Sequence, residues 1–199
     1  SFVSPWSHEY SDDLAAREEA GTPNVIGDIR AALVFLVKEA VGQADIEAQE
    51  AHFTTMAREG WGDNPHLTLL GSATAERLPI FSFLVTGASG APVHQQLFTR
   101  MLSDIYGIQA RGGCACAGPY AHRLLEIDRQ ASDELFTDLK AGKEMRKPGW
   151  VRLNFSYLMS DETAQYIIDS VNELSLNAEE MAEQYSVDQS TARFKALVA

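Results

Sequence analysis

The chain contains the stretch Pro148-Gly149-Trp150-Val151-Arg152-Leu153-Asn154-Phe155, in which apolar and polar side chains alternate. Successive side chains of a strand point to opposite faces of its sheet, so the apolar residues at 151, 153 and 155 would share one face. Arg152 and Asn154 would share the other. We therefore predict a strand from Trp150 to Leu158. The Arg152 face either lines a cleft, where the guanidinium could bind a carboxylate through two hydrogen bonds, or is only solvated.

Apolar runs elsewhere in the chain predict three more strands. We expect them at His66–Leu70, Ile80–Val85 and Ile108–Arg111. Apolar residues at helical spacing, flanked by capping residues, predict helices. These run from Thr22-Pro23 to Gly42, over Asp45–Glu59, over Pro92–Gly107, near Ser132–Ala141, and from the cap Ser160 to about Leu174. Because no series of βαβ units is present, we predict an α+β fold with a small, mostly antiparallel sheet covered by helices.

Glycine, proline and polar residues mark the segments without regular structure. We expect a loop over Gly60–Pro65, a turn over Gly87–Gly90 and an irregular start over residues 1–20. The end of the chain shows only a weak helical pattern. The chain is thus divided into a lead-in over residues 1–22, a body over 23–176 and a helical tail over 177–199.

The composition predicts a soluble protein. The 199 residues include 28 acidic and 16 basic side chains, which gives a net charge of −12. This charge disfavours nucleic acids and anionic membranes as partners, since both need a basic surface. No apolar run approaches the roughly 18 residues of a membrane helix, and the start does not resemble a signal peptide. The two cysteines are too close in sequence to pair readily, so we expect a reducing cytoplasm and no structural disulfide.

Both cysteines lie in the small-residue stretch Arg111-Gly112-Gly113-Cys114-Ala115-Cys116-Ala117-Gly118-Pro119. A thiol becomes a nucleophile when a cation or a helix N-terminus stabilises its thiolate, and Pro119 is a candidate helix start. The alternative is that Cys114 and Cys116 are buried and act as small apolar residues. His122 could add one ligand to a metal, but no fourth ligand is apparent, so we predict no metal site.

The stretch Arg17-Glu18-Glu19-Ala20-Gly21-Thr22-Pro23-Asn24 opens the first long helix. A Gly-Thr turn at a helix start offers free N–H groups, a hydroxyl and the positive end of the helix dipole, which together suit a phosphate. The alternative is an ordinary helix cap at Thr22.

Taken together, the three stretches resemble the class V aminotransferase family, in its cysteine desulfurase or selenocysteine lyase branch. The Arg17–Asn24 block is similar to the family loop that reaches the pyridoxal phosphate (PLP) of the partner subunit. The pattern Arg111-x-Gly113-x-x-Cys116 is similar to the segment with the catalytic cysteine, and Val151-Arg152-Leu153 to the strand whose arginine holds the substrate carboxylate. The resemblance extends from the start of the chain to about Leu174.

This resemblance implies the C-terminal, small domain of a fold-type I PLP-dependent transferase or lyase that works as a homodimer on an amino acid such as cysteine. Cys116 would be the catalytic nucleophile and Arg152 the substrate-binding residue, while Gly21 and Thr22 would contact the phosphate of the partner subunit's PLP. The residues 1–22 would then come from the end of the large domain, and the helix after them would connect the two domains.

The Schiff-base lysine of the family lies in a Ser-x-His-Lys-like context, and none of the lysines here has that setting. They are Lys38, Lys140, Lys143, Lys147 and Lys195. We therefore expect a portion of a longer enzyme that is inactive alone and binds no PLP covalently. Two alternatives stay open. One is an aminotransferase or other PLP reaction with Cys116 as a bystander, and the other is a non-catalytic substrate-side or dimerisation module.

Overall fold

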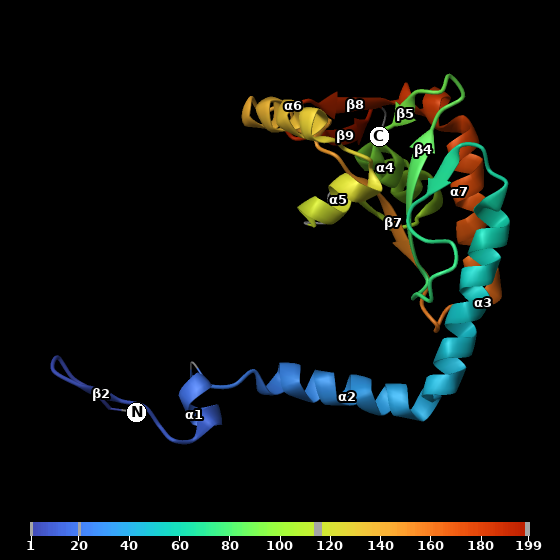
Figure 1. Cartoon of the computed structure of the whole chain (residues 1–199). Helices are drawn as coiled ribbons and strands as arrows, with labels where there is room; N and C mark the ends of the chain where they lie inside the picture. Colours follow the sequence, from blue (N-terminus) through green and yellow to red (C-terminus); the bar gives the residue numbers. More distant parts are fainter. Residues whose placement is uncertain (1, 20, 114–116, 198–199) are drawn as a thin grey trace. The chain divides into compact units, whose positions relative to one another are not determined.

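The computed structural model describes residues 2–19, 21–113 and 117–197, which form two compact units. The first unit, Ser1–Ile46, contains a two-stranded hairpin and two helices (Figure 1). These are β1 (Phe2–Val3), β2 (His8–Glu9), α1 (Leu14–Glu18) and α2 (Val25–Val41). Helix α3 (Gln43–Gly62) begins in this unit and supplies the second unit, Glu47–Ala199, with most of its length.

The second unit is built on a five-stranded sheet in the order β3-β4-β7-β6, with β5 paired to β4. Its strands are β3 (Leu67–Leu69), β4 (Ile80–Thr86), β5 (Pro92–Val93), β6 (Arg111–Gly113) and β7 (Trp150–Asn154). Its helices are α4 (Gln95–Tyr106), α5 (Gly118–Leu124), α6 (Arg129–Lys140), the short 3-10 helix η1 (Glu144–Arg146) and α7 (Asp161–Ala182). Every strand pairing is antiparallel, which confirms the predicted α+β fold.

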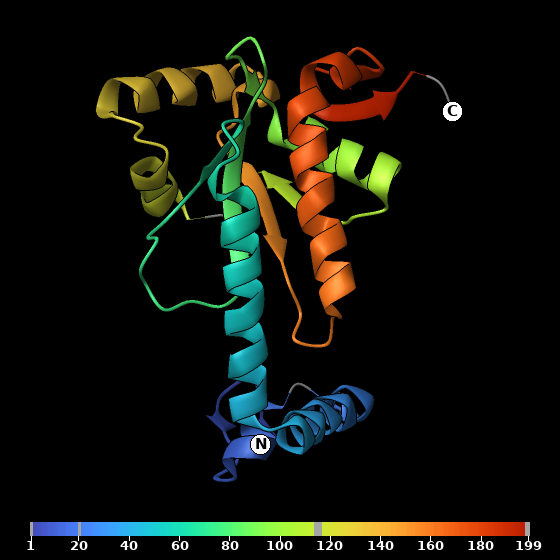
Figure 2. The same ribbon diagram turned by 90° about the vertical axis from the view of Figure 1, so that its right-hand side faces the viewer.

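The hydrophobic core lies between one face of this sheet and helices α3, α4 and α7. Phe81, Phe83 and Val151 face these helices and are at most 1% exposed. Helices α3 and α7 run side by side (Figure 2), and the indole Nε1 of Trp61 donates a hydrogen bond to the Ile168 carbonyl at 3.2 Å. Helices α5 and α6 lie on the other side of the sheet (Figure 1). The two faces of the sheet therefore differ: one packs against the hydrophobic core, and the other carries polar side chains such as Arg152 and Ser82.

The start of the chain differs from the prediction in two ways. Residues 2–19 are only partly irregular, because the β1–β2 hairpin and helix α1 form there. Helix α2 does not begin at Thr22-Pro23 but at Val25, since the side chain of Asn24 accepts a hydrogen bond from the Gly27 N–H at 3.1 Å and caps the helix. Its predicted end at Gly42 is confirmed, with φ of 90°.

Tertiary packing explains the errors in the middle of the chain. Part of the expected Gly60–Pro65 loop is the last turn of α3, because Trp61 is buried in the core at 1% exposure. Pro92 does not open a helix, since Pro92 and Val93 pair with β4. Helix α4 begins two residues after Val93, where the Nδ1 atom of His94 accepts from the Gln96 N–H.

Three further boundaries follow from local hydrogen bonds. Strand β6 starts at Arg111, because the Ile108 N–H is used to cap α4 through the Leu102 carbonyl. Strand β7 ends at Asn154, shortly before a turn in which the Met159 N–H donates to the Ser156 carbonyl. The tail is helical only to Ala182. After it, β8 (Tyr185–Asp188) and β9 (Arg193–Ala196) form a hairpin.

Helix α2 is apolar around most of its circumference, and none of its residues is buried. Eight of its nine large apolar side chains are 51–69% exposed, and Val41 at its end is half-buried. The eight exposed ones are Val25, Ile26, Ile29, Leu33, Val34, Phe35, Leu36 and Val37. A helix that is hydrophobic all round is usually covered by other parts of a protein. No helix of the described part of the chain is both long and apolar enough to cross a membrane.

Candidate functional site

A row of polar residues crosses the sheet on the face opposite the core. Arg152 of β7 is the Cα partner of Ser82 on β4 and of Arg111 on β6. Directly paired residues of an antiparallel sheet point to the same face, with Cβ atoms about 5 Å apart. Arg152 is half-buried between Val151 and Leu153, which point into the core. The strand thus has the predicted alternation.

The two paired arginines have no carboxylate partner among the described residues. Neither Arg111 nor Arg152 forms an ion pair there. Like charges directly opposite each other in a sheet are unfavourable, and an anion between them removes the repulsion. Two guanidinium groups at one place can hold a carboxylate through several charge-assisted hydrogen bonds. The pairing was not predictable from the sequence, because it depends on the register of β6 against β7.

The candidate nucleophile Cys116, together with Cys114, lies outside the described residues. The chain enters this segment from Gly113, whose Cα partner is Trp150, two residues from Arg152 along β7. It leaves the segment at Ala117, the residue before helix α5. A helix start at Pro119 was predicted, and α5 contains a proline in its first turn. The role of Cys116 as a nucleophile stays a prediction.

His122 has a structural role, because its ring links two helices. Its Nδ1 atom is 2.8 Å from the Gly118 carbonyl, which can only accept, so Nδ1 carries a proton. Its Nε2 atom is 2.9 Å from the Ser132 hydroxyl. The ring therefore joins helix α5 to helix α6 and has both nitrogens engaged.

His94 was not singled out by the sequence, yet it is the histidine with a shifted pKa. Burial lowers the pKa of His94, while the backbone of Met145 raises it to a lesser extent. Its Nε2 atom is buried without a hydrogen-bond partner at normal distance. The ring packs 5.4 Å from that of Phe194 and lies with Arg111 beside a hollow at the open edge of β6. This half-buried imidazole caps the start of α4 through its Nδ1 atom.

Gly21 and Thr22 belong to the first unit and are exposed. Gly21 has φ of 139°, a conformation that side chains other than hydrogen rarely adopt. Thr22 does not cap α2, so its hydroxyl is not used in that role, and Asn24 provides the cap. The phosphate contact proposed for Gly21 and Thr22 stays a prediction.

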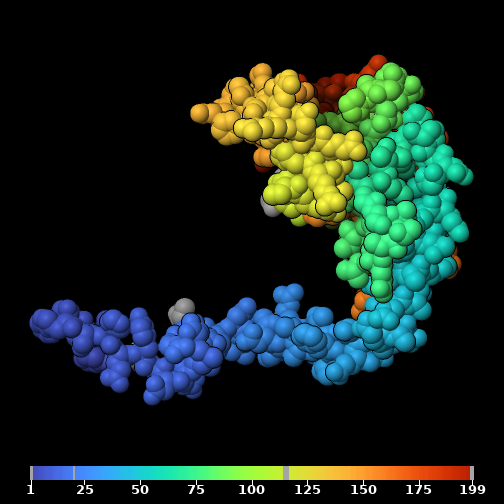
Figure 3. Space-filling view, viewed as in Figure 1, coloured from blue at the N-terminus to red at the C-terminus, as the bar shows by residue number. Residues whose placement is uncertain are grey.

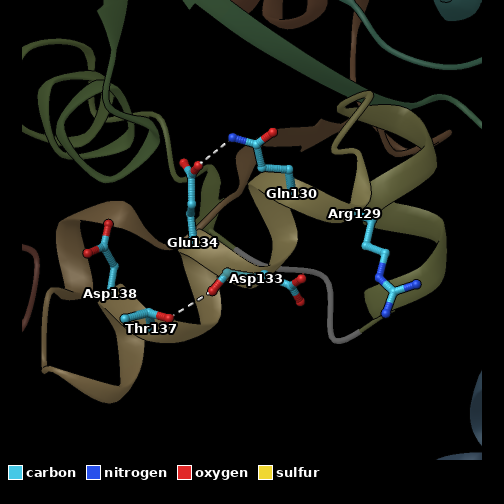
Figure 4. A pocket seen from close by; sticks show the side chains of 6 residues that line it. All are labelled: Arg129, Gln130, Asp133, Glu134, Thr137 and Asp138. Carbon is cyan, nitrogen blue, oxygen red and sulfur yellow. Dashed lines mark hydrogen bonds between the residues drawn. The ribbon is translucent and has the colours of Figure 1, made fainter.

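A different hollow lies along helix α6 and contains none of the predicted site residues. It is lined by Arg129, Gln130, Asp133, Glu134, Thr137 and Asp138 (Figure 4). Some of these polar groups bond to one another within the helix: the Gln130 amide donates to Glu134 at 3.0 Å, and the Thr137 hydroxyl donates to the Asp133 carbonyl at 2.9 Å. Asp138 pairs instead with Lys143 and Arg146 beyond the end of α6. Within residues 2–19, 21–113 and 117–197, no group of three or more His, Cys, Asp or Glu side chains could hold a metal ion.

Close contact between β6 and β7 depends on Gly149. A Cβ atom at this position would lie 2.6 Å from the Gly113 carbonyl carbon and 2.7 Å from its Cα. We expect Gly149→Ala to push β6 away from β7 and to lower the free energy of unfolding by roughly 1–3 kcal/mol, as overpacking does. Urea unfolding followed by circular dichroism measures this loss. Gly62→Ala is the control, since no atom lies within 4 Å of its Cβ position. Equal stability of both variants would contradict the prediction.

Comparison with known proteins identifies the family. The profile of the family Aminotransferase class-V matches residues 2–165. The chain belongs to the class-V aminotransferase family. This match spans the Gly21-Thr22 turn, the cysteine segment and Arg152. No curated protein matches the chain.

The solved structures that resemble this class-V chain include two cysteine desulfurases. The apo structure of the cysteine desulfurase from Thermococcus onnurineus NA1 has a TM-score of 0.66 and 25% identity and covers 88% of the chain. The cysteine desulfurase CsdA (S-sulfonic acid) from Escherichia coli has a TM-score of 0.51 and 24% identity over 87% of the chain, a likeness in fold alone. The chain spans 37% of the length of each. Its architecture is therefore that of part of a fold-type I PLP-dependent transferase.

Proposed function

We propose that this chain is the C-terminal portion of a PLP-dependent enzyme that removes sulfur from cysteine or a similar amino acid, with Cys116 as the persulfide-forming nucleophile. The observation that carries the proposal is the register of β6 and β7. It sets Arg111 opposite Arg152, and β6 leads directly into the segment with Cys116. The family match and the likeness to a cysteine desulfurase support the same reading.

Arg152 would bind the carboxylate of the substrate. Its half-buried place on the strand limits its motion, and the planar guanidinium matches the two oxygens of a carboxylate. Arg111, its cross-strand partner, would add a second positive charge at the same place. Together they would fix the amino acid with its side chain free to reach the cysteine segment.

Cys116 would act on the sulfur of the bound substrate. Its thiolate attacks that sulfur, an S–S bond forms, and the C–S bond of the substrate breaks with its electron pair left on carbon. In a complete enzyme, PLP supplies the electron withdrawal that makes this cleavage possible.

The lysines of this chain do not fit a covalent PLP site. Lys143 and Lys147 bind Asp138 and Glu144, with N–O distances of 2.7 and 3.4 Å. Lys140 lies over the Phe136 ring at the end of α6, while Lys38 and Lys195 are exposed. A Schiff-base lysine needs a desolvated pocket that lowers its pKa. We therefore assign the covalent link to a part of the enzyme outside this chain and propose that the chain alone is inactive.

The test uses the longer protein that contains this chain, with added PLP, cysteine and a thiol reductant. We expect sulfide release that follows Michaelis–Menten kinetics. Arg152→Gln should raise the KM for cysteine roughly 10- to 100-fold, because a hydrogen bond between charged groups contributes about 1.5–3 kcal/mol. Arg193→Gln, which removes an exposed arginine of β9, should leave KM unchanged.

Other outcomes separate the alternatives. Transfer of the amino group to a keto acid without sulfide would indicate an aminotransferase. A protein without a PLP absorbance band after addition of the cofactor would indicate a non-catalytic module. Either result would reject the desulfurase proposal. The homodimer and the cytoplasmic location also belong to the proposal, and light scattering of the longer protein tests the first of them.

A further inference from the structure

A small cavity opens where strand β3 separates from β4. The Leu70 N–H still donates to the Ser82 carbonyl at 2.8 Å, but from Gly71 the chain turns away into the β3–β4 loop. In place of a neighbouring strand, the Arg77 side chain donates to the Ile80 carbonyl. The cavity left beside this edge has a volume of about 140 Å³. The loop that borders it is exposed and lies on the surface of the second unit (Figure 3).

Two arginines from different elements line this cavity. Arg58 comes from helix α3 and Arg77 from the β3–β4 loop, and both are half-buried. Arg58 donates to the Ser72 carbonyl at 3.2 Å, and the guanidinium carbon of Arg77 lies 5.0 Å from the centre of the Phe81 ring. Each guanidinium has five N–H groups, so these contacts leave most of its donors unused.

The cavity holds more positive charge than the fold uses. Neither Arg58 nor Arg77 forms an ion pair with a carboxylate of the described residues. Burial lowers the pKa of Arg77, and the charge of Arg58 lowers it further, with a smaller opposite effect from Tyr120. If the two side chains served only to satisfy backbone carbonyls, a neutral amide would do so without this repulsion. An anion between them would turn the repulsion into attraction.

We propose that this cavity binds a small tetrahedral dianion of the phosphate or sulfate type between Arg58 and Arg77. Guanidinium groups bind such oxyanions through pairs of parallel hydrogen bonds. Ser72 and Ser82 also line the cavity and supply polar groups. The volume is well below the roughly 300 Å³ at which sites for drug-sized ligands begin, so the ligand is an ion or a terminal phosphate rather than a whole cofactor.

The net charge of −12 makes non-specific anion binding by this chain unfavourable. A protein so acidic repels free anions on average, so any saturable anion binding must come from a local cluster of cations. The proposal does not depend on the desulfurase proposal, because its ligand and its residues are separate from Cys116 and Arg152.

The test is a titration of the ¹⁵N-labelled chain with sodium phosphate and, separately, sodium sulfate, at an ionic strength held constant with sodium chloride. We expect saturable chemical-shift changes confined to the backbone of residues 70–77 and to Arg58. Acetate, a monoanion, should bind more weakly. Arg58→Gln should lower the affinity for phosphate at least ten-fold, and Arg58→Lys, which keeps the charge but loses the fork, should lower it less.

Arg30→Gln is the control, because it removes the same charge from an exposed position on helix α2. It should leave the affinity for phosphate unchanged. We test Arg58 rather than Arg77, because Arg77→Gln would also remove the hydrogen bond to the Ile80 carbonyl that holds the loop. Thermal unfolding gives a second readout: phosphate should raise the Tm of the unaltered chain but not of Arg58→Gln. Shifts that do not saturate, or equal weakening by Arg30→Gln and Arg58→Gln, would overturn the proposal.

Discussion

Replacement of Cys116 by alanine is expected to reduce sulfide release from cysteine to background in the longer enzyme of which we propose that this chain is a part. The physical reason is that the sulfur of the substrate needs an acceptor, and only a thiolate can form the S–S bond that replaces the broken C–S bond. Binding of the substrate should change little, because we propose that Arg152, not Cys116, holds the carboxylate. Sulfide formation under steady-state conditions and mass spectrometry of the persulfide-bearing peptide measure the effect.

Cys114→Ala is the matched control, since it makes the same chemical change two residues away. It should retain most of the activity, because Cys116 is nearer in sequence than Cys114 to Ala117, the N-cap position of α5, and a helix N-terminus favours a thiolate. If Cys114→Ala lost activity and Cys116→Ala retained it, the nucleophile would be Cys114, and our assignment to Cys116 would be wrong. Full activity of both variants would make both cysteines bystanders.

Trp61→Ala is expected to destabilise the second unit by roughly 3–5 kcal/mol, the range for removal of a large buried aromatic side chain. Trp61 is 1% exposed, and its ring lies 5.2 Å from Phe81 and 5.7 Å from Phe83. The variant also removes the hydrogen bond to the Ile168 carbonyl that ties α3 to α7. Urea unfolding followed by far-UV circular dichroism gives the free energy without relying on tryptophan fluorescence.

The chain provides its own control for this variant. Trp6 is 91% exposed, so Trp6→Ala should change the free energy of unfolding by less than about 0.5 kcal/mol. The loss of unfolding free energy in Trp61→Phe should lie between those of Trp61→Ala and Trp6→Ala, since phenylalanine keeps most of the apolar contact but lacks the indole N–H. A loss below about 1 kcal/mol in Trp61→Ala would show that α3 does not depend on this packing.

Local patterns predicted the strand at Trp150 well, because its alternation reflects a buried face and an open face directly. The same reasoning failed at Gly60–Pro65, where a composition typical of loops coincides with a core tryptophan. Glycines lower helix propensity by about 1 kcal/mol each, which the burial of one indole outweighs. Pro92 misled for a related reason: proline also suits a short strand at a sheet edge, where it need not donate a hydrogen bond.

The site was less accessible to sequence reasoning than the fold. The roles predicted for Arg152 and Cys116 followed from the resemblance of their motifs to a family. The opposition of Arg111 and Arg152 required the strand register, which no local pattern specifies. Arg58 and Arg77 come from a helix and a loop with no common period, so only the separation of β3 from β4 brings them to one cavity.

The exposed apolar surface of helix α2 makes protein concentration a variable in every experiment on the isolated chain. Large exposed apolar patches promote association, and the free energy gained grows with the area that two copies hide from water. A sample dilute enough for kinetics and one concentrated enough for NMR would then hold different mixtures of species. Anion titrations and unfolding curves should therefore be repeated over a range of dilutions before values from different methods are compared.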